Sequence, residues 1–397
     1  MNCSRCERTK KDVMALVKVS DECYICSKCI SELNTKLGAV VQDKTDNRNK
    51  KKQTKIPSAK DMVEHLNQYI VGQDEAKKTL SIAVRNHFKR ITMVPDERKD
   101  ISKSNVMIIG PSGTGKTELV RRLAEYVDIP MIVVDANSFT SAGYTGDDVE
   151  SMIVKLYNAS GNNKENTEHG IIFIDEIDKK KKEASQATQK DIGGEEVQKS
   201  LLKIIEGRDV KINNAVTIDT SNILFISAGA FVNLDKIVKT RMSDTSVGFL
   251  SPSVNANITD QVTNEDLFKF GMIPEFIGRF PITAYTNELT DSELFTIATV
   301  PKTSAYKQYK KLFQMDNVEL VIEDAVIEDI IKQVKKDKVG VRGIQKHFDT
   351  LLKEHQYNLE SYHEQNIQKI TFYMDDGVVK FKVAKRRGTK KLTVIGG

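Results

Sequence analysis

The residues best suited to chemistry are a lysine and a threonine at the end of a glycine-rich segment. This segment, Gly110–Thr117, reads GPSGTGKT and fits the pattern G-x-x-x-x-G-K-[ST]. Glycines let such a loop fold tightly, so that its backbone N–H groups point at phosphate oxygens. The pattern predicts that Lys116 reaches the β- and γ-phosphates of a nucleotide and that the Thr117 hydroxyl binds Mg²⁺.

Two acidic residues further along the chain, Asp175 and Glu176, complete this chemistry in the segment IIFIDEID. They follow an apolar run, and ligands of parallel sheets bind outside the carboxyl ends of the strands. We expect Asp175 to hold the magnesium shell and Glu176 to act as the base that orients water for attack on the γ-phosphate. The two segments together indicate an ATPase or a nucleotide-dependent switch, with ATP and Mg²⁺ as cofactors.

Buried parallel strands and one helix must position these residues. Asn105–Ile109 and Ile171–Ile174 are continuous apolar runs, as is typical of strands buried on both faces. A helix from Thr117 to about Tyr126 would add its positive N-terminal end to the phosphate site. Asn222–Ile226 predicts a third buried strand, whose end would place Ser227 near the same phosphate or leave it as an ordinary loop hydroxyl.

All five cysteines lie within the first thirty residues, as Cys3, Cys6, Cys23, Cys26 and Cys29. Two Cys-x-x-Cys pairs separated by about 15–20 residues are typical of a tetrahedral zinc site. The spacing allows either Cys23 with Cys26 or Cys26 with Cys29 as the second pair. One cysteine is therefore left over, and the spacing alone does not say which.

The composition narrows the class of protein. Charged residues make up 29% of the 397 residues and hydrophobic residues 39%, as in soluble globular proteins. No apolar run approaches the ~18 residues of a membrane span, and the first ten residues lack the apolar core of a signal peptide. We therefore expect a cytoplasmic protein. The basic excess is confined to residues 1–60, which weakens the case for a nucleic-acid binder.

The segment TSAGYTGDDVESMIVKLY places a tyrosine, Tyr144, between glycines. Asp147 and Asp148 should begin a helix, because acidic residues are favoured in its first turn. Tyr144 either folds back on the surface as part of a turn or belongs to a loop that grips another molecule. The residues alone leave both interpretations open.

Eight segments, several of them far more specific than the phosphate-binding pattern, carry a resemblance to a known family. They are YICSKC (Tyr24–Cys29), YIVGQDEAKKTL (Tyr69–Leu80), GPSGTGKTE (Gly110–Glu118), AGYTGDDVES (Ala142–Ser151), FIDEIDK (Phe173–Lys179), GGEEVQKSLLKIIEG (Gly193–Gly207), DTSNILFISAGAFVNLDKIV (Asp219–Val238) and LFKFGMIPEFIGRFP (Leu267–Pro281). Through them the chain resembles the ClpX family of AAA+ protein unfoldases over nearly its whole length. The related HslU unfoldases share many of these segments, but they lack the N-terminal zinc module and carry a large inserted domain for which this chain has no room.

The resemblance implies an α/β fold with three parts. An AAA+ P-loop NTPase, a parallel sheet with flanking helices, is followed by a small α+β C-terminal domain and preceded by a treble-clef-like zinc module. The expected boundaries are residues 1–42 for the zinc-binding domain, 43–55 for a flexible basic linker, 56–288 for the large ATPase domain and 289–397 for the small domain.

The resemblance also assigns the nucleotide site. Arg279, in EFIGR, matches the arginine finger that reaches a neighbouring subunit's nucleotide, and Arg342, in VGVRG, matches the sensor arginine of the small domain. Ile70 and Val71 match the segment that packs on adenine. Glu176 and Arg279 are then the catalytic residues. The implied nucleotide-binding residues are Ile70, Val71, Gly110, Pro111, Ser112, Gly113, Thr114, Gly115, Lys116, Thr117, Glu118, Asp175 and Arg342.

Three further sites follow from the resemblance alone. Cys3, Cys6, Cys26 and Cys29 match the zinc ligands, which leaves Cys23 over. Gly143, Tyr144, Thr145 and Gly146 match the pore loop whose aromatic side chain grips a translocating polypeptide. Val247, Gly248 and Phe249 match a loop tripeptide that docks on the ring peptidase ClpP. Without the resemblance, that apolar tripeptide would equally well anchor the polar stretch Arg241–Asn264 on its own domain.

The implied function is that of a homohexameric, ATP-dependent unfoldase and translocase without peptidase activity of its own. It would feed unfolded or tagged proteins to a ClpP-type peptidase and meet adaptor proteins through the zinc domain. Two alternatives are an ATP-dependent chaperone that works without a protease, and a DNA-handling AAA+ motor. The basic N-terminal region favours the DNA motor, whereas Tyr144 in place of a basic pore residue speaks against it.

Three departures from the family pattern stand out. The segment Gly207–Asp219 is short and lacks the Arg-Lys-His triplet that the family uses at the pore entrance, so recognition of a free C-terminal carboxylate is in doubt. Thr145 stands where the family usually has valine. The run Lys179–Lys182 is either a solvated loop or a positively charged pore lining.

Overall fold

The computed structural model describes residues 2–6, 8–9, 13, 15–20, 23–30, 57–98, 100–139, 148–182, 192–213, 216–245, 261–337 and 339–385. The chain divides into two compact units, Met1–Ile56 and Pro57–Gly397, and each is described by itself. Among the described helices, none combines the length and the apolar character that a membrane crossing requires.

The N-terminal unit contains a β-hairpin followed by a helical turn. Strand β1 (Leu16–Ser20) pairs antiparallel with β2 (Cys23–Cys26), and residues 27–30 are helical. The buried core of this unit consists of Cys3, Cys26 and Cys29. A unit with so little apolar core ordinarily needs a metal or a disulfide to be stable. This arrangement fits the predicted zinc module.

A five-stranded parallel sheet forms the centre of the second unit. The strands lie in the order β4 (Met131–Asp135), β5 (Ile171–Asp175), β8 (Leu224–Gly229), β3 (Val106–Ile109) and β9 (Ile282–Tyr285). All neighbouring pairs are parallel. The carboxyl ends of β3 and β5, which precede the phosphate-loop segment and the two acids, therefore lie at the same edge of the sheet.

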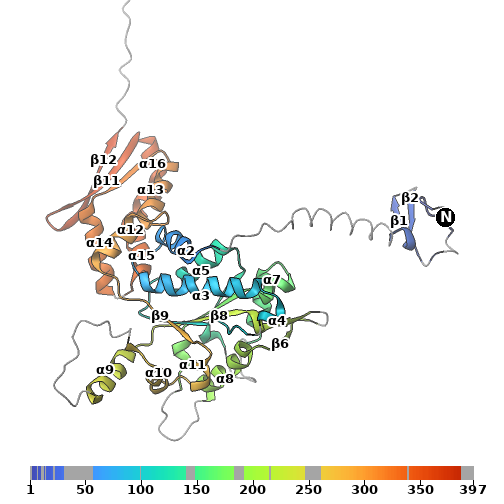
Figure 1. The fold of residues 1–397 in the computed structure, drawn as a ribbon. Coiled ribbons are helices and arrows are strands. Elements are labelled where there is room, and N and C mark those ends of the chain that lie inside the picture. Colours follow the sequence, from blue (N-terminus) through green and yellow to red (C-terminus); the bar gives the residue numbers. More distant parts are fainter. Residues whose placement is uncertain are drawn as a thin grey trace, which may run out of the picture. The chain divides into compact units, whose positions relative to one another are not determined.

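Helices cover both faces of this sheet. One face carries α2 (Ala59–Asn67), α3 (Asp74–Thr92) and α5 (Lys116–Val127), and the other carries α6 (Ser151–Ala159), α8 (Ile192–Glu206), α10 (Asn264–Phe270) and α11 (Pro274–Gly278). Figure 1 shows α3 and α5 on one side of the strands and α8, α10 and α11 on the other. Along β3, Val106 and Ile108 pack in the core on the side of α2, α3 and α5, and Met107 and Ile109 pack in the core on the opposite side. Burial on both faces explains why this strand reads as a continuous apolar run.

Shorter elements complete the large α/β part. They are α4 (Pro95–Arg98), η1 (Ala136–Ser138), α7 (Lys164–Glu168), η2 (Ile177–Lys180), β6 (Asp209–Lys211), β7 (Thr217–Asp219), η3 (Thr220–Asn222) and α9 (Leu234–Thr245). β6 and β7 pair antiparallel, so the short segment Gly207–Asp219 contains a small hairpin. α6 begins at Ser151 rather than at Asp148, because residues 149 and 150 form a turn.

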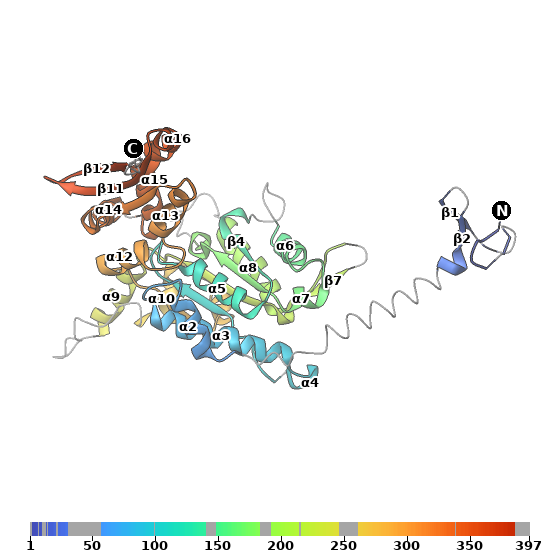
Figure 2. The same cartoon turned by 90° about the horizontal axis from the view of Figure 1, so that it is seen from above.

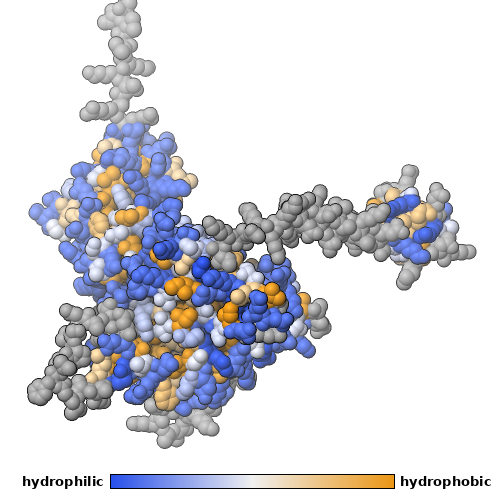
Figure 3. Space-filling view, viewed as in Figure 1, coloured by the Kyte–Doolittle hydropathy of each residue, from blue (hydrophilic) through white to orange (hydrophobic). Residues whose placement is uncertain are grey.

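The C-terminal part is a smaller α+β domain with its own core. Its helices and strands are α12 (Asp291–Thr299), α13 (Ala305–Met315), β10 (Glu319–Ile322), α14 (Asp324–Asp337), α15 (Val341–Tyr357), α16 (Leu359–Glu364), β11 (Ile367–Asp375) and β12 (Val378–Lys385). β11 pairs parallel with β10 and antiparallel with β12. Figure 2 shows the helices of this part gathered beside β11 and β12. On the face seen in Figure 3, hydrophobic residues are interspersed among hydrophilic ones.

Candidate functional site

The glycine-rich segment joins β3 to α5, as the sequence predicts. Gly113 and Gly115 have φ angles of +76° and +89°, which are left-handed conformations that favour glycine. α5 begins at Lys116, so the unpaired N–H groups of its first turn lie at the end of the loop. A helix N-terminus of this kind attracts anions, and phosphate is the anion that the sequence pattern predicts.

Lys116 is folded back onto the loop that precedes it. Its Nζ donates hydrogen bonds to the carbonyl oxygens of Gly110 (2.7 Å) and Pro111 (2.8 Å). Burial lowers the pKa of Lys116, and the nearby carboxylates of Asp175 and Asp178 oppose this effect. The ammonium group is thus held beside the phosphate loop by neutral carbonyl groups, which a phosphate oxygen can replace.

The two predicted magnesium ligands lie next to each other. Thr117 Oγ1 donates a hydrogen bond to Asp175 Oδ2 over 3.0 Å. Hydroxyl and carboxylate oxygens suit Mg²⁺, which usually takes only one or two protein ligands and completes its shell with water and phosphate. The residues present therefore fit the ion that the sequence implies.

Glu176 follows Asp175 in an unusual backbone conformation. Its φ angle is +56°, and its side chain is exposed. Asn137 Nδ2 donates a hydrogen bond to Glu176 Oε2 over 2.5 Å. Asn137 lies in η1, directly after β4, and β4 pairs with β5 so that Asp135 stands opposite Asp175. Asn137 is not among the residues predicted from the sequence, although its place as a polar residue just past a strand beside Asp175 is a signal for it.

A cavity of about 600 Å³ opens in front of these groups. Its lining unites the phosphate loop, the acids after β5, the end of β8 and the start of α15. The volume is in the range of a nucleotide site. The predicted residues that line it are Ser112, Gly113, Gly115, Lys116, Thr117, Glu118, Asp175, Glu176 and Arg342.

The small domain contributes directly to this cavity. Arg342 stands in the first turn of α15, and the preceding Val341 N–H donates a hydrogen bond to Gly113 O over 3.3 Å. A Cβ atom on Gly113 would lie 3.0 Å from Val339 O, so the two backbones touch. The phosphate loop and the start of α15 therefore form one continuous surface.

Four cysteine thiols converge in the N-terminal unit. The sulfur atoms of Cys3, Cys6, Cys26 and Cys29 all lie within 4.8 Å of one another, and Cys23 is not part of this group. The Sγ–Sγ distances of 3.9 Å (Cys3–Cys29) and 3.6 Å (Cys6–Cys26) match the ~3.8 Å expected for tetrahedral zinc with 2.3 Å bonds.

Backbone N–H groups support two of the thiols, Cys3 and Cys26, as thiolates, whereas burial raises the pKa of Cys29. The Cys26 N–H donates to Cys3 Sγ (3.3 Å), and the Cys29 N–H donates to Cys26 Sγ (3.4 Å). Burial alone would raise the pKa of Cys3, but hydrogen bonds from the backbone of Arg5, Cys26 and Cys6 lower it to about 6. The donor set and its geometry fit zinc.

Comparison with known proteins agrees with this geometry. The model of the AAA domain (Cdc48 subfamily) matches residues 101–283. The ATP-dependent Clp protease ATP-binding subunit ClpX of Treponema denticola is 39% identical over 369 residues, which cover 88% of this chain and 88% of the relative. The proteins of the same name from Borrelia duttonii and Borrelia recurrentis are each 37% identical over 390 residues, which cover 94% of this chain and 90% of the relative. The chain belongs to the ClpX family. Membership in this family and the AAA domain identify the protein as an ATPase. It is the ATP-binding type of Clp subunit and is not itself a peptidase.

Arg279, matched to the ClpX-family arginine finger, lies away from the nucleotide cavity of its own chain. It directly follows the last residue of α11, and its Nη2 and Nε lie 2.5 Å and 3.1 Å from Glu206 Oε1. Both side chains are about half exposed. The role at a neighbouring subunit's nucleotide, which the resemblance implies for Arg279, stays a prediction.

Six other predicted residues are not part of the cavity lining: Ile70, Val71, Gly110, Pro111, Thr114 and Ser227. Ile70 is buried in the core beneath α2 and α3, and neither it nor Val71 lines the cavity. The adjacent Tyr69 lines a second cavity of about 310 Å³ together with Val341 at the start of α15. Ser227 lies inside β8, which continues to Gly229, and is completely buried. The prediction that Ser227 ends this strand is therefore wrong.

Three lysines of the run Lys179–Lys182 contact other parts of the chain. Lys180 Nζ donates to Phe139 O over 3.0 Å, Lys181 Nζ lies 5.2 Å from the centre of the Phe270 ring, and Lys182 pairs with Glu195. Lys180, Lys181 and Lys182 thus contact their own chain, so a purely solvated loop does not describe them, and the pore lining stays a prediction.

Several predicted sites lie outside the described residues. They are the pore-loop residues Gly143, Tyr144, Thr145 and Gly146 and the docking residues Val247, Gly248 and Phe249. The linker 43–55 also lies there. These assignments remain predictions from the resemblance to the ClpX family.

Proposed function

We propose that the protein is an ATP-driven unfoldase and translocase that acts in the cytoplasm as a homohexameric ring and delivers polypeptides to a ClpP-type peptidase. The observation that carries this proposal is the cavity that joins the phosphate loop, the acids after β5 and Arg342, in a chain that matches ClpX proteins over nearly their whole length.

Five residues of the cavity have a task in the proposed hydrolysis: Lys116, Thr117, Asp175, Glu176 and Arg342. Lys116 exchanges its carbonyl partners, Gly110 and Pro111, for phosphate oxygens. Thr117 and Asp175 would hold Mg²⁺, whose charge would offset the negative charge of the phosphates. Glu176 gives up its hydrogen bond with Asn137 and accepts a proton from the attacking water. Arg342 reaches the same nucleotide from the small domain, because its helix starts against the loop.

Because Arg342 and the phosphate loop belong to different domains, nucleotide binding can change the angle between them. Hinge motions of this kind commonly follow the state of a nucleotide. Around a ring, such motions would move the loop with Tyr144 and pull a polypeptide through the centre. The zinc domain, which forms a separate compact unit, is free to receive substrates or adaptor proteins.

The zinc assignment predicts a difference between two neighbouring cysteines. Cys26→Ser should lower the zinc content from one ion per chain to well below one and should unfold the N-terminal unit, since ligation supplies much of the folding free energy of so small a module. Cys23→Ser, the matched control, should keep its zinc because Cys23 is outside the cluster. Elemental analysis of the purified proteins measures both. Equal zinc loss in the two variants would contradict the ligand assignment.

The peptidase partner is tested by the docking tripeptide. Deletion of Val247–Phe249, or Phe249→Ala, should abolish binding to a ClpP-type peptidase and degradation of a folded, tagged substrate. Several weak contacts around a ring combine through effective concentration, so weakening all of them at once removes assembly. ATP hydrolysis and substrate unfolding should persist, because the nucleotide cavity is unchanged.

Phe268→Ala provides the matched control, since Phe268 is an exposed phenylalanine of the same domain, on α10. It should degrade substrate as the wild type does. If the deletion variant still assembles with the peptidase at wild-type affinity, the tripeptide is not the docking element, and a chaperone that works without a protease becomes the better description.

A further inference from the structure

We propose that Gln198, on α8, couples a subunit's own nucleotide site to Arg279, the arginine that the subunit presents to its neighbour. The inference rests on the proposed function, in which Arg279 acts across a subunit interface. Gln198 is then a positioning residue: it touches neither nucleotide, but it joins the segment after Glu176 to the short helix that carries Arg279.

The side chain of Gln198 is completely buried and uses both ends of its amide group. Nε2 donates to the carbonyl oxygens of Lys180 (2.7 Å) and Gly271 (3.3 Å), and Oε1 accepts a hydrogen bond from the Ile273 N–H (2.9 Å). Buried polar groups that lose such partners are costly. Gln198 therefore holds three backbone groups, from two segments that are far apart in sequence, in one fixed arrangement.

The first of these segments continues directly from the catalytic acids. Lys179 N–H donates to Glu176 O over 3.0 Å, and this turn forms the start of η2, which ends at Lys180. α8 packs closely on the segment: a Cβ atom on Gly194 would lie 2.7 Å from Lys181 O and 2.9 Å from Lys180 O. A movement of the backbone at Glu176 therefore reaches Gln198 through a single helical turn.

The second segment carries the arginine. Ile273 precedes α11, a helix of only five residues, and Arg279 follows its last residue. Gln198 holds the first end through the Ile273 N–H, and Glu206, the last residue of α8, pairs with Arg279 at the other end. The same helix thus contacts α11 at both ends and fixes where Arg279 stands.

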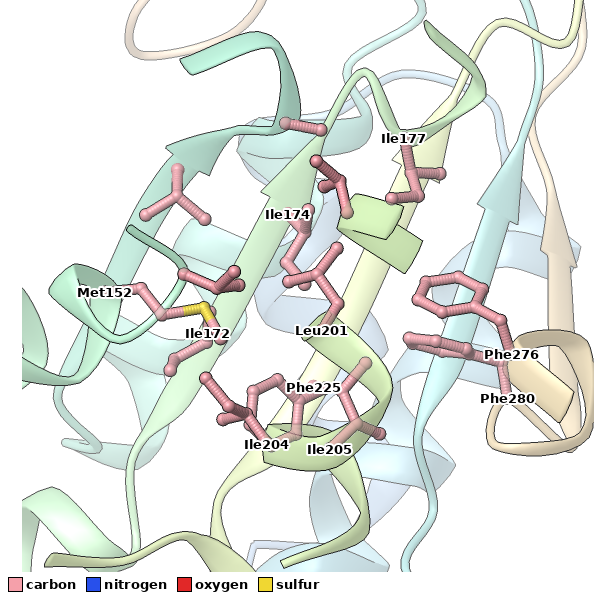
Figure 4. Close-up of a cluster of buried hydrophobic side chains, with 14 of the residues drawn as sticks. Met152, Ile172, Ile174, Ile177, Leu201, Ile204, Ile205, Phe225, Phe276 and Phe280 are labelled. Carbon is pink, nitrogen blue, oxygen red and sulfur yellow. The ribbon is translucent and has the colours of Figure 1, made fainter. Parts of the chain in front are cut away.

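The body of α8 is firmly packed between these two contacts. Figure 4 shows Leu201, Ile204 and Ile205 of α8 in one cluster with Ile172 and Ile174 of β5. The cluster also includes Phe276 and Phe280, which precede and follow Arg279 in the sequence. Close-packed interiors of this kind transmit small displacements. The buried Asn105 adds a restraint on the other side, because its Nδ2 donates to Arg279 O over 3.0 Å.

The two contacts between α8 and α11, made by Gln198 and by Glu206, differ in strength, as expected if one positions Arg279 and the other can release it. The pair between Arg279 and Glu206 is exposed, so it stabilises little and can break when a neighbouring nucleotide competes for the arginine. The amide of Gln198 is buried and fully hydrogen-bonded, so its connection persists. Gln198 sets the position of the arginine, and Glu206 holds its guanidinium only in the absence of a better partner.

The test uses the full-length protein with Gln198→Leu and Gln198→Glu. Leucine removes all three hydrogen bonds, whereas glutamate keeps an acceptor for the Ile273 N–H and loses the donors to Lys180 and Gly271. Both variants should bind a fluorescent ATP analogue within about twofold of wild type and lose at least about tenfold in kcat with little change in KM, as expected when only a transition-state interaction is removed. The matched control is Lys203→Gln, an exposed position on the same helix, which should leave kcat unchanged.

A double variant shows whether Gln198 acts through Arg279. If it does, Gln198→Leu combined with Arg279→Ala should be no slower than Arg279→Ala alone, because residues that act as one unit are not additive. Glu206→Gln should change kcat by less than about fivefold, the most that an exposed ion pair ordinarily contributes. Thermal unfolding separates these effects from misfolding; if the leucine variant is unfolded, the glutamate variant carries the test.

Three results would overturn the inference. Wild-type kcat in a folded Gln198 variant would show that Gln198 does not position Arg279. Multiplicative losses in the double variant would show that it acts independently. Wild-type kcat in Arg279→Ala would overturn the proposed role of Arg279 itself and the inference with it, whereas a loss in Arg279→Ala without one in the Gln198 variants overturns the inference alone.

Discussion

Replacing Glu176 with glutamine is expected to reduce ATP hydrolysis by about 10²–10⁴-fold while ATP binding stays near the wild-type affinity. Glutamine has the size of glutamate and can still accept the hydrogen bond from Asn137 through its amide oxygen. Lys116, Thr117 and Asp175 are unchanged, so the phosphates and Mg²⁺ keep their ligands. What is lost is the proton acceptor for the attacking water.

Asn137→Ala separates the carboxylate from its partner. This variant keeps Glu176 as a base and removes only the amide that holds it, so its hydrolysis should fall far less than that of Glu176→Gln. Steady-state phosphate release measures the rates, and titration with a fluorescent ATP analogue measures binding. Turnover of Glu176→Gln within about twofold of wild type would rule out its assignment as the base.

Replacing Arg279 with alanine is expected to reduce hydrolysis by about 10³-fold or more, the usual contribution of an arginine finger. The loss should arise at the neighbouring subunit, because Arg279 does not line the cavity of its own chain. Arg208→Ala is the matched control: Arg208 forms a comparable exposed pair with Glu150 at 2.7 Å. It should hydrolyse ATP as the wild type does.

Mixed rings test whether Arg279 acts in trans. An Arg279→Ala subunit keeps Glu176, and a Glu176→Gln subunit keeps Arg279, so a site between the two can be complete although each parent is inactive. In rings co-assembled from equal amounts, about one site in four has this arrangement, because each head-to-tail interface joins two independently chosen subunits. The mixture should therefore be far more active than the two parents. No recovery in rings shown to contain both subunits would mean that Arg279 acts within its own subunit or only supports the fold.

Short sequence patterns predicted those parts of the site that lie within one continuous segment. The loop from Gly110 to Thr117 and the acids Asp175 and Glu176 follow buried strands, and their positions could be inferred because the apolar runs before them are unmistakable. The four cysteines were harder, because two spacings were acceptable. The resemblance selected Cys26 and Cys29, and the structure brings both of them, rather than Cys23, beside Cys3 and Cys6.

Features that depend on tertiary contacts could not be predicted from local sequence patterns. β4 is an edge strand with a partly exposed apolar pattern, so neither it nor Asn137 beyond it was recognised. The apolar run of β8 was expected to end before Ser227, but the strand continues through small residues to Gly229. Gln198 looks like an ordinary polar position on an amphipathic helix, and only the folded chain shows that three backbone groups surround it.

The left-handed backbone at Glu176 has a consequence for how this protein can evolve. A non-glycine residue with a φ angle of +56° is strained by about 1 kcal/mol or more relative to glycine at the same place. Selection for heat resistance alone would therefore favour glycine there and discard the carboxylate that we propose as the base of hydrolysis. Glu176 is therefore expected to persist only where ATP hydrolysis is under selection. Among descendants of this chain, loss of the glutamate would mark proteins that keep the fold but no longer hydrolyse ATP.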